Sequence, residues 1–174
     1  LGGQGLLVSN EFVAARAEVL RSNLERMGVP NAVVLNEDTG RIAAALPEFF
    51  DRVLVDAPCS GLGIIRKKPD IRYKNPRDLA QLPAIQGDIL ENAYRYVCPG
   101  GVLVYSTCTI DPAENQQQIA AFLARHPEFT VVEPAAALPA GMTAGEHGAL
   151  SVPTRTGMDG FFLCAMQKNG EKLQ

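Results

Sequence analysis

Two cysteines lie in short polar loops where a thiol could act chemically. Cys59 stands in the segment Asp56-Ala-Pro-Cys-Ser-Gly61, and Cys108 stands in Ser106-Thr-Cys-Thr109. A thiol is a useful nucleophile only when its pKa falls and it stays accessible, which a loop at a strand end allows and a packed strand does not. The two loops therefore predict a nucleophilic site, with Asp56 as an acid on the first loop.

The other two cysteines suit the protein interior. Cys98 follows an expected helix and Cys164 lies in an apolar run, and free cysteine is among the most buried residue types. The four cysteines form no C-x-x-C pair and have no histidine close by in sequence, so a zinc site is not expected. Without a recognisable secretion signal, a disulfide framework is not expected either, and we predict a cytoplasmic protein.

The elements that must position these loops alternate between strands and helices. Apolar runs predict strands, and apolar residues every three or four positions predict helices. The strands are expected at 6–8, 32–35, 53–55, 102–105, 129–132 and 161–166, and the helices at 13–27, at 42–46, from a first turn that holds Pro83 to 97, and from 111 onwards. Ser9 or Asn10 should cap the first helix, and Asp111 the last, with Glu114 completing a capping box. Residues 98–101 should end the third helix.

This order of elements favours an α/β fold with a mostly parallel sheet and an antiparallel edge near the C-terminus. In such sheets, ligands bind beyond the carboxyl ends of the strands. The side chains expected there are Glu11, Asp38, Asp56, Cys59 and Cys108. For each acid, a role as a cap or as a solvated loop residue remains the alternative.

Length and composition limit the class of protein. The chain has 174 residues, of which 47% are hydrophobic and 20% charged, as in an ordinary soluble domain, so disorder and coiled coil are excluded. No apolar run approaches the roughly 20 residues of a membrane span. The formal net charge is −3, which makes any local excess of basic residues informative.

One such excess follows the first cysteine loop directly. Five basic residues fall within nine positions and enclose one tyrosine: Arg66, Lys67, Lys68, Arg72, Tyr73 and Lys74. Basic side chains that contact phosphate, together with an aromatic ring that stacks on a base, are typical of RNA binding. A solvated run of charge is the alternative.

Together these motifs closely resemble the RsmB/RsmF (Nop/Sun) family. The resemblance rests on the two cysteine loops, on Pro99-Gly-Gly101 and on Gly160-Phe-Phe162, and it extends from about residue 6 to residue 168. It implies a Rossmann-like fold and S-adenosylmethionine-dependent methylation of cytosine C5 in 16S rRNA. Within the family, residues 68–73 favour the RsmB branch. The implied partner is small-subunit rRNA, unassembled or partly assembled, with no metal and no membrane.

The resemblance also implies a role for each candidate residue. Cys108 would be the nucleophile that adds to C6 of the cytosine, and Cys59 would assist breakdown of the covalent adduct. Asp56 would approach both the cofactor and the cytosine ring. Glu11 would hold the ribose hydroxyls of the cofactor, and Asp38 would lie beside its adenine.

The chemistry explains why these residue types are needed. Cytosine C5 is too weak a nucleophile to attack a methyl sulfonium, so a thiolate first adds at C6 and raises the electron density at C5. After methyl transfer, a base removes the C5 proton and the thiolate is expelled. An acid near N3 of the ring, here Asp56, can stabilise the adduct. The target base must be single-stranded or flipped out of its helix to reach the thiol.

One part of the family pattern is missing. The family's cofactor pocket begins with a Gly-rich loop of the form Ala-Pro-Gly-Gly-Lys, which does not occur here. We therefore expect residues 1–174 to be one methyltransferase catalytic domain that lacks its N-terminal part, including the central strand of the sheet. Such a sheet should be interrupted in the middle and should leave backbone groups unpaired.

Three other functions remain as alternatives. The chain could be an RNA-binding module without catalysis, although such a module has no need of two thiols at strand ends. It could be a DNA cytosine methyltransferase, in which the Pro-Cys thiol, here Cys59, is itself the nucleophile. A Cys–His hydrolase would have to use His126 or His147, both of which stand late in the chain.

Overall fold

The computed structural model describes residues 3–133 and 138–170, and the chain divides into two compact units between Ala45 and Leu46. The first unit holds β1 (Leu7–Asn10), α1 (Ala14–Arg26), β2 (Ala32–Leu35) and α2 (Thr39–Ala45). β1 and β2 pair in parallel, with Leu7 opposite Ala32 and Asn10 opposite Leu35. The carboxyl ends of both strands therefore lie at the same edge of this small sheet.

Helix α1 begins later than the sequence pattern indicates. Ser9 and Asn10 belong to β1, so the prediction that either caps the helix is wrong. The Asn10 amide is already engaged, because it donates to Glu37 O and its Oδ1 accepts from Glu37 N. The N-cap is Val13, whose N–H donates to the Glu11 carboxylate at 2.9 Å. The side chain of Glu11 thus supports the helix start.

The second unit is built on a six-stranded sheet with the order β3-β4-β8-β7-β6, in which β5 also pairs with β8. Its strands are β3 (Phe50–Asp56), β4 (Val97–Thr107), β5 (Phe129–Val132), β6 (Thr143–Gly145), β7 (Gly148–Ser151) and β8 (Phe161–Lys168). β3 and β4 are parallel, and the other pairs are antiparallel. The sheet therefore combines a parallel N-terminal part with an antiparallel C-terminal part.

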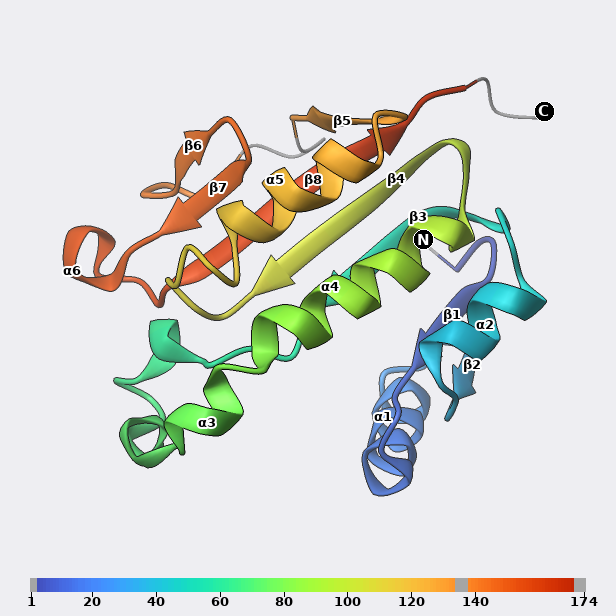
Figure 1. Ribbon diagram of the computed structural model, residues 1–174. Coiled ribbons are helices and arrows are strands. Elements are labelled where there is room, and N and C mark those ends of the chain that lie inside the picture. The colour runs from blue at the N-terminus through green and yellow to red at the C-terminus, as the bar shows by residue number, and fades with distance from the viewer. Residues whose placement is uncertain (1–2, 134–137, 171–174) are drawn as a thin grey trace. The chain divides into compact units, whose positions relative to one another are not determined.

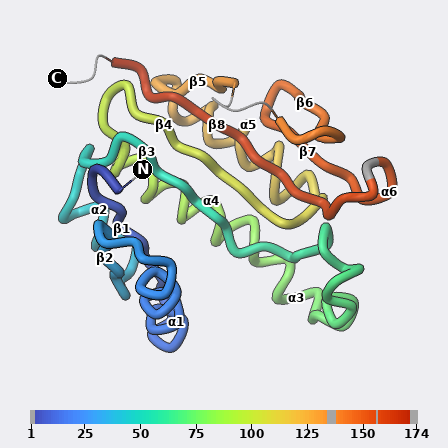
Figure 2. The backbone as a smooth tube through the Cα atoms, turned by 180° about the vertical axis from the view of Figure 1, so that it is seen from behind, coloured from blue at the N-terminus to red at the C-terminus, as the bar shows by residue number. Residues whose placement is uncertain are grey.

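Helices α4 and α5 pack on one face of this sheet, in front of it in Figure 1 and behind it in Figure 2. The helical segments of the unit are η1 (Leu62–Ile64), η2 (Pro69–Tyr73), α3 (Pro76–Leu79), α4 (Leu82–Ala93), η3 (Tyr94–Tyr96), α5 (Gln116–Arg125) and α6 (Pro153–Thr156). The core between helices and sheet contains Leu90, Leu103, Tyr105, Phe122 and Phe162, all fully buried. This packing supports β4, whose carboxyl end carries Cys108.

The prediction that residues 98–101 end a helix is wrong. α4 ends at Ala93, and β4 already begins at Val97 and includes all four residues. The register of β4 against β3 shifts between Phe50 and Arg52, and a Cβ at Gly101 would lie 2.8 Å from Cys98 O. Glycine at these positions therefore allows an irregular strand. In the sequence, the same glycines are equally compatible with a loop.

Helix α5 also begins later than predicted, at Gln116. Asp111 Oδ1 accepts from Ala113 N at 2.9 Å, so this carboxylate closes a turn that precedes the helix. Glu114 does not complete a capping box. Its side chain points inward and is 2% exposed.

The structure confirms the α/β class. β1 and β2 form one hydrogen-bonded sheet and the six later strands form another, and the interruption of a single sheet stays a prediction. The connection at 134–157 holds β6, β7 and α6, while 134–137 lie outside the described residues. Within the described part of the chain, no helix is both long and apolar enough to cross a membrane.

Candidate active site

The two loop cysteines meet at the carboxyl ends of neighbouring parallel strands. Cys59 follows β3 and Cys108 follows β4, and the last paired residues of these strands are Asp56 and Ser106. The Sγ atoms of Cys59 and Cys108 lie 3.3 Å apart. The predicted convergence of the two thiols is therefore confirmed.

The thiol of Cys59 is partly buried, and this burial changes its pKa. Burial raises the pKa of the Cys59 thiol to about 12, and its hydrogen bond with Cys108 acts in the same direction. Cys59 is therefore a neutral thiol near pH 7. A neutral thiol can donate a hydrogen bond or a proton, whereas attack on an electrophile requires a thiolate.

Asp56 is the third polar group at this edge. It is the last residue of β3 and is exposed, and Ser106 Oγ donates to its Oδ1 at 3.3 Å. Ala57 N also donates to Ser106 O at 2.9 Å, which keeps the two strand ends in register. The carboxylate of Asp56 is thus oriented from one side and remains open to a ligand on the other.

The loop after Cys59 approaches the loop before β8 so closely that only glycine fits. A Cβ at Gly63 would lie 2.2 Å from Gly160 O and 2.8 Å from Cys108 O. In turn, Gly63 N donates to Cys108 O and Gly160 N donates to Gly63 O. Backbone hydrogen bonds through Gly63 therefore link the segment after the Cys59 loop to Cys108 and to Gly160.

Polar side chains from the turn before α5 hold the Cys108 loop. Thr107 Oγ1 donates to Asn115 Oδ1 at 2.6 Å, and Asn115 Nδ2 donates to Thr109 O at 3.0 Å. The hydroxyl of Tyr105 donates to Glu114 O at 2.7 Å. Burial, together with the charge of Glu114, raises the pKa of Tyr105, so its hydroxyl stays protonated and continues to donate.

Glu114 and Gln86 are site residues that the sequence motifs do not indicate. Gln86 is fully buried on α4, and its Nε2 donates to Pro58 O and to Glu114 Oε2. One signal was available for Gln86, because it shares the buried stripe of α4 with Leu90 and Ala93. Glu114 gave no such signal, since its spacing from Asp111 matches a capping box.

Glu11 and Asp38 lie in the first unit, close to the carboxyl ends of β1 and β2. Glu11 Oε2 pairs with Arg16 at 3.0 Å, in addition to the bond that its Oε1 accepts from Val13 N. Asp38 Oδ1 accepts from Gly40 N at 2.8 Å and so starts α2. Both acids therefore support helix starts, and their part in ligand binding stays a prediction.

The basic segment, residues 66–74, consists of η2 and the residues that flank it, and its members differ in their contacts. Arg66 and Lys67 pair with Asp159 at 3.7 and 2.5 Å, and the hydrogen bond from Lys67 lowers the pKa of that carboxyl. Lys74 Nζ donates to Ser60 O at 2.8 Å. The remaining three residues, Lys68, Arg72 and Tyr73, are exposed, with Tyr73 at 84%.

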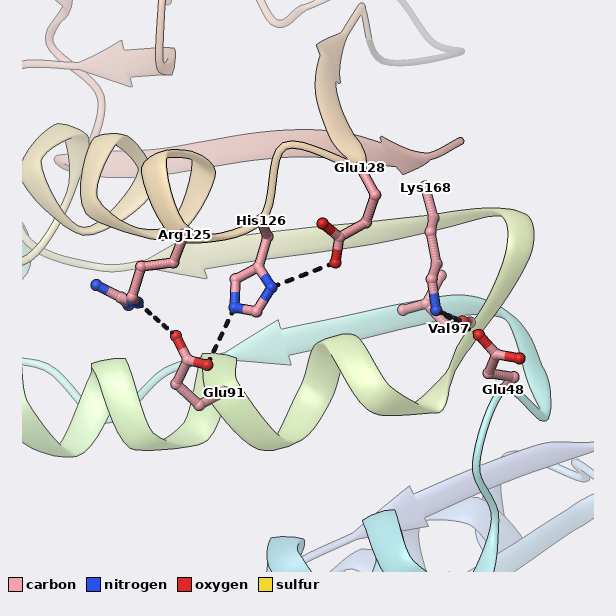
Figure 3. A network of polar contacts seen from close by, with 7 residues as sticks. All are labelled: Glu48, Glu91, Val97, Arg125, His126, Glu128 and Lys168. Atoms are coloured by element: carbon pink, nitrogen blue, oxygen red, sulfur yellow. Dashed lines mark hydrogen bonds and ion pairs between the residues drawn. The ribbon is translucent and has the colours of Figure 1, made fainter. Parts of the chain in front are cut away.

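Neither histidine is placed to activate a thiol. Figure 3 shows that the ring nitrogens of His126 face Glu91 and Glu128, at 3.0 and 3.3 Å. His147 Nδ1 lies 3.9 Å from Glu146. Across residues 3–133 and 138–170, no three histidine, cysteine, aspartate or glutamate side chains are grouped so as to hold a metal ion. These contacts give a Cys–His hydrolase no support.

The α/β fold corresponds to the class of Rossmann-like methyltransferases. The sequence pattern of the family described as 16S rRNA methyltransferase RsmB/F matches residues 1–167. The chain therefore belongs to the RsmB/F family, with the Rossmann-like methyltransferase fold expected from the resemblance.

Two relatives illustrate the match. The chain is 40% identical over 169 residues to ribosomal RNA small subunit methyltransferase F of Cronobacter sakazakii, which covers 95% of this chain and 35% of that protein. The corresponding protein of Vibrio vulnificus is 47% identical over 118 residues, covering 67% of this chain and 25% of that protein. The chain thus spans about a third or less of these curated relatives, and neither of them supports the RsmB branch.

Solved structures agree with this fold. The crystal structure of PH0851 superposes with a TM-score of 0.87 at 32% identity, over 95% of this chain and 38% of that one. The structure of NSun6 from Pyrococcus horikoshii gives a TM-score of 0.81 at 23% identity, over 97% of this chain and 43% of that one. The second likeness concerns the fold alone.

Proposed function

We propose that this chain is the catalytic part of an S-adenosylmethionine-dependent RNA (cytosine-5-)-methyltransferase that acts on 16S rRNA. The observation that carries the proposal is the 3.3 Å separation of the Cys59 and Cys108 Sγ atoms at the ends of β3 and β4, beside Asp56. Two thiols and one acid are the groups that covalent attack at C6 and later release of the adduct require. Its working place would be the cytoplasm, where rRNA is processed.

The residues of the first unit fit the cofactor chemically. Glu11 and Asp38 provide carboxylate oxygens near the carboxyl ends of two adjacent parallel strands, where such oxygens can accept hydrogen bonds from ribose hydroxyls and adenine. S-adenosylmethionine, when bound, supplies an electrophilic methyl group on a sulfonium sulfur. In this proposal Glu11 holds the ribose, Asp38 lies beside the adenine, and Asp56 contributes from the end of β3.

In the proposed reaction Cys108 attacks the cytosine. The Cys108 thiol first gives its proton to solvent; its Sγ then forms a bond to C6, the C5=C6 double bond is lost, and the electron density at C5 rises. Asp56 stabilises the adduct at N3 of the ring. Once C5 carries the methyl group, a base takes the C5 proton, the double bond re-forms and the bond between Sγ and C6 breaks.

Cys59 is proposed to act in the release step. In the free protein burial raises the pKa of Cys59 to about 12, and in this proposal Cys59 keeps its proton while Cys108 is bonded to the substrate. A protonated thiol 3.3 Å from the leaving sulfur can donate a hydrogen bond to that sulfur as the negative charge returns to it.

The basic segment is proposed as the RNA contact. Lys68, Arg72 and Tyr73 are exposed, so they can reach phosphates and a base without breaking an existing contact. Arg66 and Lys67 face Asp159, and Lys74 is bonded to Ser60 O, so these three would contribute mainly through local positive potential. The substrate in this proposal is small-subunit rRNA before or during assembly.

The test is methylation of 16S rRNA with S-adenosylmethionine, scored by nucleoside mass spectrometry and by adducts that resist denaturation. C108A should abolish both 5-methylcytosine and the adduct. C59A should lower turnover by about a hundredfold while the adduct accumulates. C98A is the matched control, because Cys98 is a half-buried thiol in β4 outside both loops, and it should behave as the unaltered protein.

Two outcomes would favour the alternatives. Loss of the adduct with C59A but not with C108A would make Cys59 the nucleophile. RNA binding without methylation under any condition would favour the RNA-binding module.

A further inference from the structure

A buried carboxylate connects the two cysteine loops. Glu114 Oε2 accepts from Ser60 N at 2.9 Å, and its Oε1 lies 3.5 Å from Thr109 Oγ1. Ser60 directly follows Cys59, and Thr109 directly follows Cys108. Ser60 Oγ and Thr109 Oγ1 also bond to each other at 2.7 Å. One side chain thus contacts the residue after each thiol.

Gln86 extends this connection to the other side of Cys59. Its Nε2 donates to Pro58 O at 2.8 Å and to Glu114 Oε2 at 2.9 Å. Because both partners are acceptors, the orientation of the amide is fixed. Cys59 is therefore held on both flanks, at Pro58 O by Gln86 and at Ser60 N by Glu114.

This arrangement is costly for folding. Glu114 is 2% exposed, and within the described part of the chain its side-chain partners are three uncharged donors. Gln86 is fully buried, and its Oε1 has no hydrogen-bond partner among the described residues. Apolar side chains of similar volume would avoid both desolvation costs. A buried polar network does, however, fix one geometry more narrowly than apolar packing does.

We propose that Glu114, supported by Gln86, is a positioning residue that sets the relative placement of Cys59 and Cys108. The inference rests on the proposed function, because it concerns the two thiols that act there. With the network intact, the neutral thiol of Cys59 stays within reach of the Cys108 sulfur throughout the reaction. With the network broken, release of the adduct slows more than its formation, because release alone requires both thiols.

The contacts define a conservative variant that keeps the geometry. Ser60 N and Gln86 Nε2 both donate to the same oxygen of Glu114, while the other oxygen faces a hydroxyl. In E114Q the amide oxygen can replace Oε2 and accept from Ser60 N and Gln86 Nε2, and the amide nitrogen can donate to Thr109 Oγ1. In E114A every one of these bonds is lost.

The placement of the thiols can be measured without any methylation. Phenylarsine oxide reacts with two neighbouring thiols to form two As–S bonds and one water, with no change in oxidation state. We would titrate the purified protein that carries this chain and follow the bridged product by intact-mass spectrometry. C59A, which cannot form the bridge, gives the background.

We expect E114Q to bind the arsenical within about twofold of the unaltered protein, and E114A about tenfold or more weakly, because buried donors are left unpaired. Q86M, which keeps the volume but removes the bonds to Pro58 and Glu114, should also bind about tenfold more weakly. If a circular-dichroism melt shows that E114A does not fold, the arsenical affinities of E114Q and Q86M are compared instead, and they test the proposal. The proposal is overturned if Q86M or folded E114A binds as tightly as the unaltered protein, or if E114Q is as weak as E114A.

A second readout addresses the reaction. In E114A the fraction of protein trapped as RNA adduct should rise, while in E114Q it should return to the unaltered level; equal trapping in all three would contradict the positioning role. The proposed function has its own test, because it is contradicted if C108A still forms 5-methylcytosine. In that case the arsenical titration still tests whether Glu114 positions the two thiols.

Discussion

The two loop cysteines have similar exposure but different surroundings. Cys59 is enclosed by its own tight loop and faces Cys108, and burial raises its pKa from the ordinary 9.0 to about 12. Cys164 in β8 has a pKa raised to about 12 by burial alone. Burial therefore makes the thiols of Cys59 and Cys164 harder to ionise than an ordinary thiol.

This difference predicts slow alkylation of Cys59 and Cys164 in the folded protein. At pH 8 the thiolate fraction of a group with a pKa near 12 is very small, so iodoacetamide should label both residues much more slowly than in urea. The rate should rise as the pH approaches 12. Peptide mass mapping gives the rates, and equal labelling with and without urea at pH 8 would contradict the assignment.

The same shifts affect stability. A raised pKa means that the folded state holds the proton more tightly, so these thiols contribute stability that is complete below pH 9 and is lost as the pH rises towards 12. The free energy of unfolding should therefore fall over this range in the unaltered protein, and fall less in a C164A variant, as urea titrations would measure.

At the scale of elements, the site depends on a close backbone crossing. η1 and the segment before β8 meet at Gly63 and Gly160, where a Cβ at Gly63 would lie 2.2 Å from a carbonyl oxygen. Backbone atoms cannot move aside as a flexible side chain can. The crossing therefore fixes how the Cys59 loop packs behind Cys108.

G63A is expected to destabilise the protein by about 3 kcal/mol, as overpacking against rigid backbone does. Urea unfolding followed by circular dichroism measures the change. G145A in β6 is the matched control, since the nearest atom to its added Cβ would be 3.5 Å away, and it should leave the free energy of unfolding nearly unchanged. Equal effects of the two substitutions would show that the crossing tolerates a side chain.

A second element contact joins α4 to the end of α5. Glu91 accepts from Arg125 at 2.8 Å and from His126 at 3.0 Å, and His126 also faces Glu128 (Figure 3). Burial alone would raise the pKa of Glu91, but the bonds from Arg125 and His126 outweigh it and lower that pKa below its ordinary 4.5. The ionised form of Glu91 is therefore the one that the fold favours.

E91Q should lower the melting temperature at pH 7, and the difference from the unaltered protein should shrink as the pH falls below 4.5. The contribution of a carboxyl with a lowered pKa is present above its unfolded value and is lost on protonation. E18Q, which removes an exposed pair with Arg21 in α1, should have little effect at either pH. A constant difference across the range would exclude ionisation of Glu91 as the cause.

At the scale of the whole molecule, an acidic chain concentrates positive charge in one segment. The formal net charge is −3, yet Arg66, Lys67, Lys68, Arg72 and Lys74 fall within nine positions. Binding of rRNA should therefore weaken as salt rises, because each phosphate contact releases counterions.

The double variant K68Q/R72Q should reduce the slope of log K against log salt by about 1.4, or roughly 0.7 per contact with single-stranded RNA. Fluorescence anisotropy at several salt concentrations measures this slope. R21Q/R26Q, which removes two exposed arginines of α1, is the matched control and should leave the slope unchanged. An unchanged slope in K68Q/R72Q would exclude this segment as the phosphate contact.

The sequence by itself determined the features that depend on local pattern. The α/β class, the strands at 129–132 and 161–166, and the convergence of Cys59 and Cys108 follow from apolar runs that end in short polar loops. Two parallel neighbouring strands bring their carboxyl ends together whatever lies between them. Such features can be derived from residues that are close in sequence.

Only the tertiary structure decided the features that depend on distant partners. Glu114 matches a helix cap by spacing, but it turns inward because Ser60 N and Gln86 Nε2, from other segments, offer it hydrogen bonds. Residues 98–101 match a helix end, but they lie inside β4 as the irregularity between two positions that pair with β3, Val97 opposite Phe50 and Val102 opposite Arg52. The physical reason is common to both cases, since a polar or flexible residue takes its conformation from whichever partners it is buried against, and those partners lie far away in sequence.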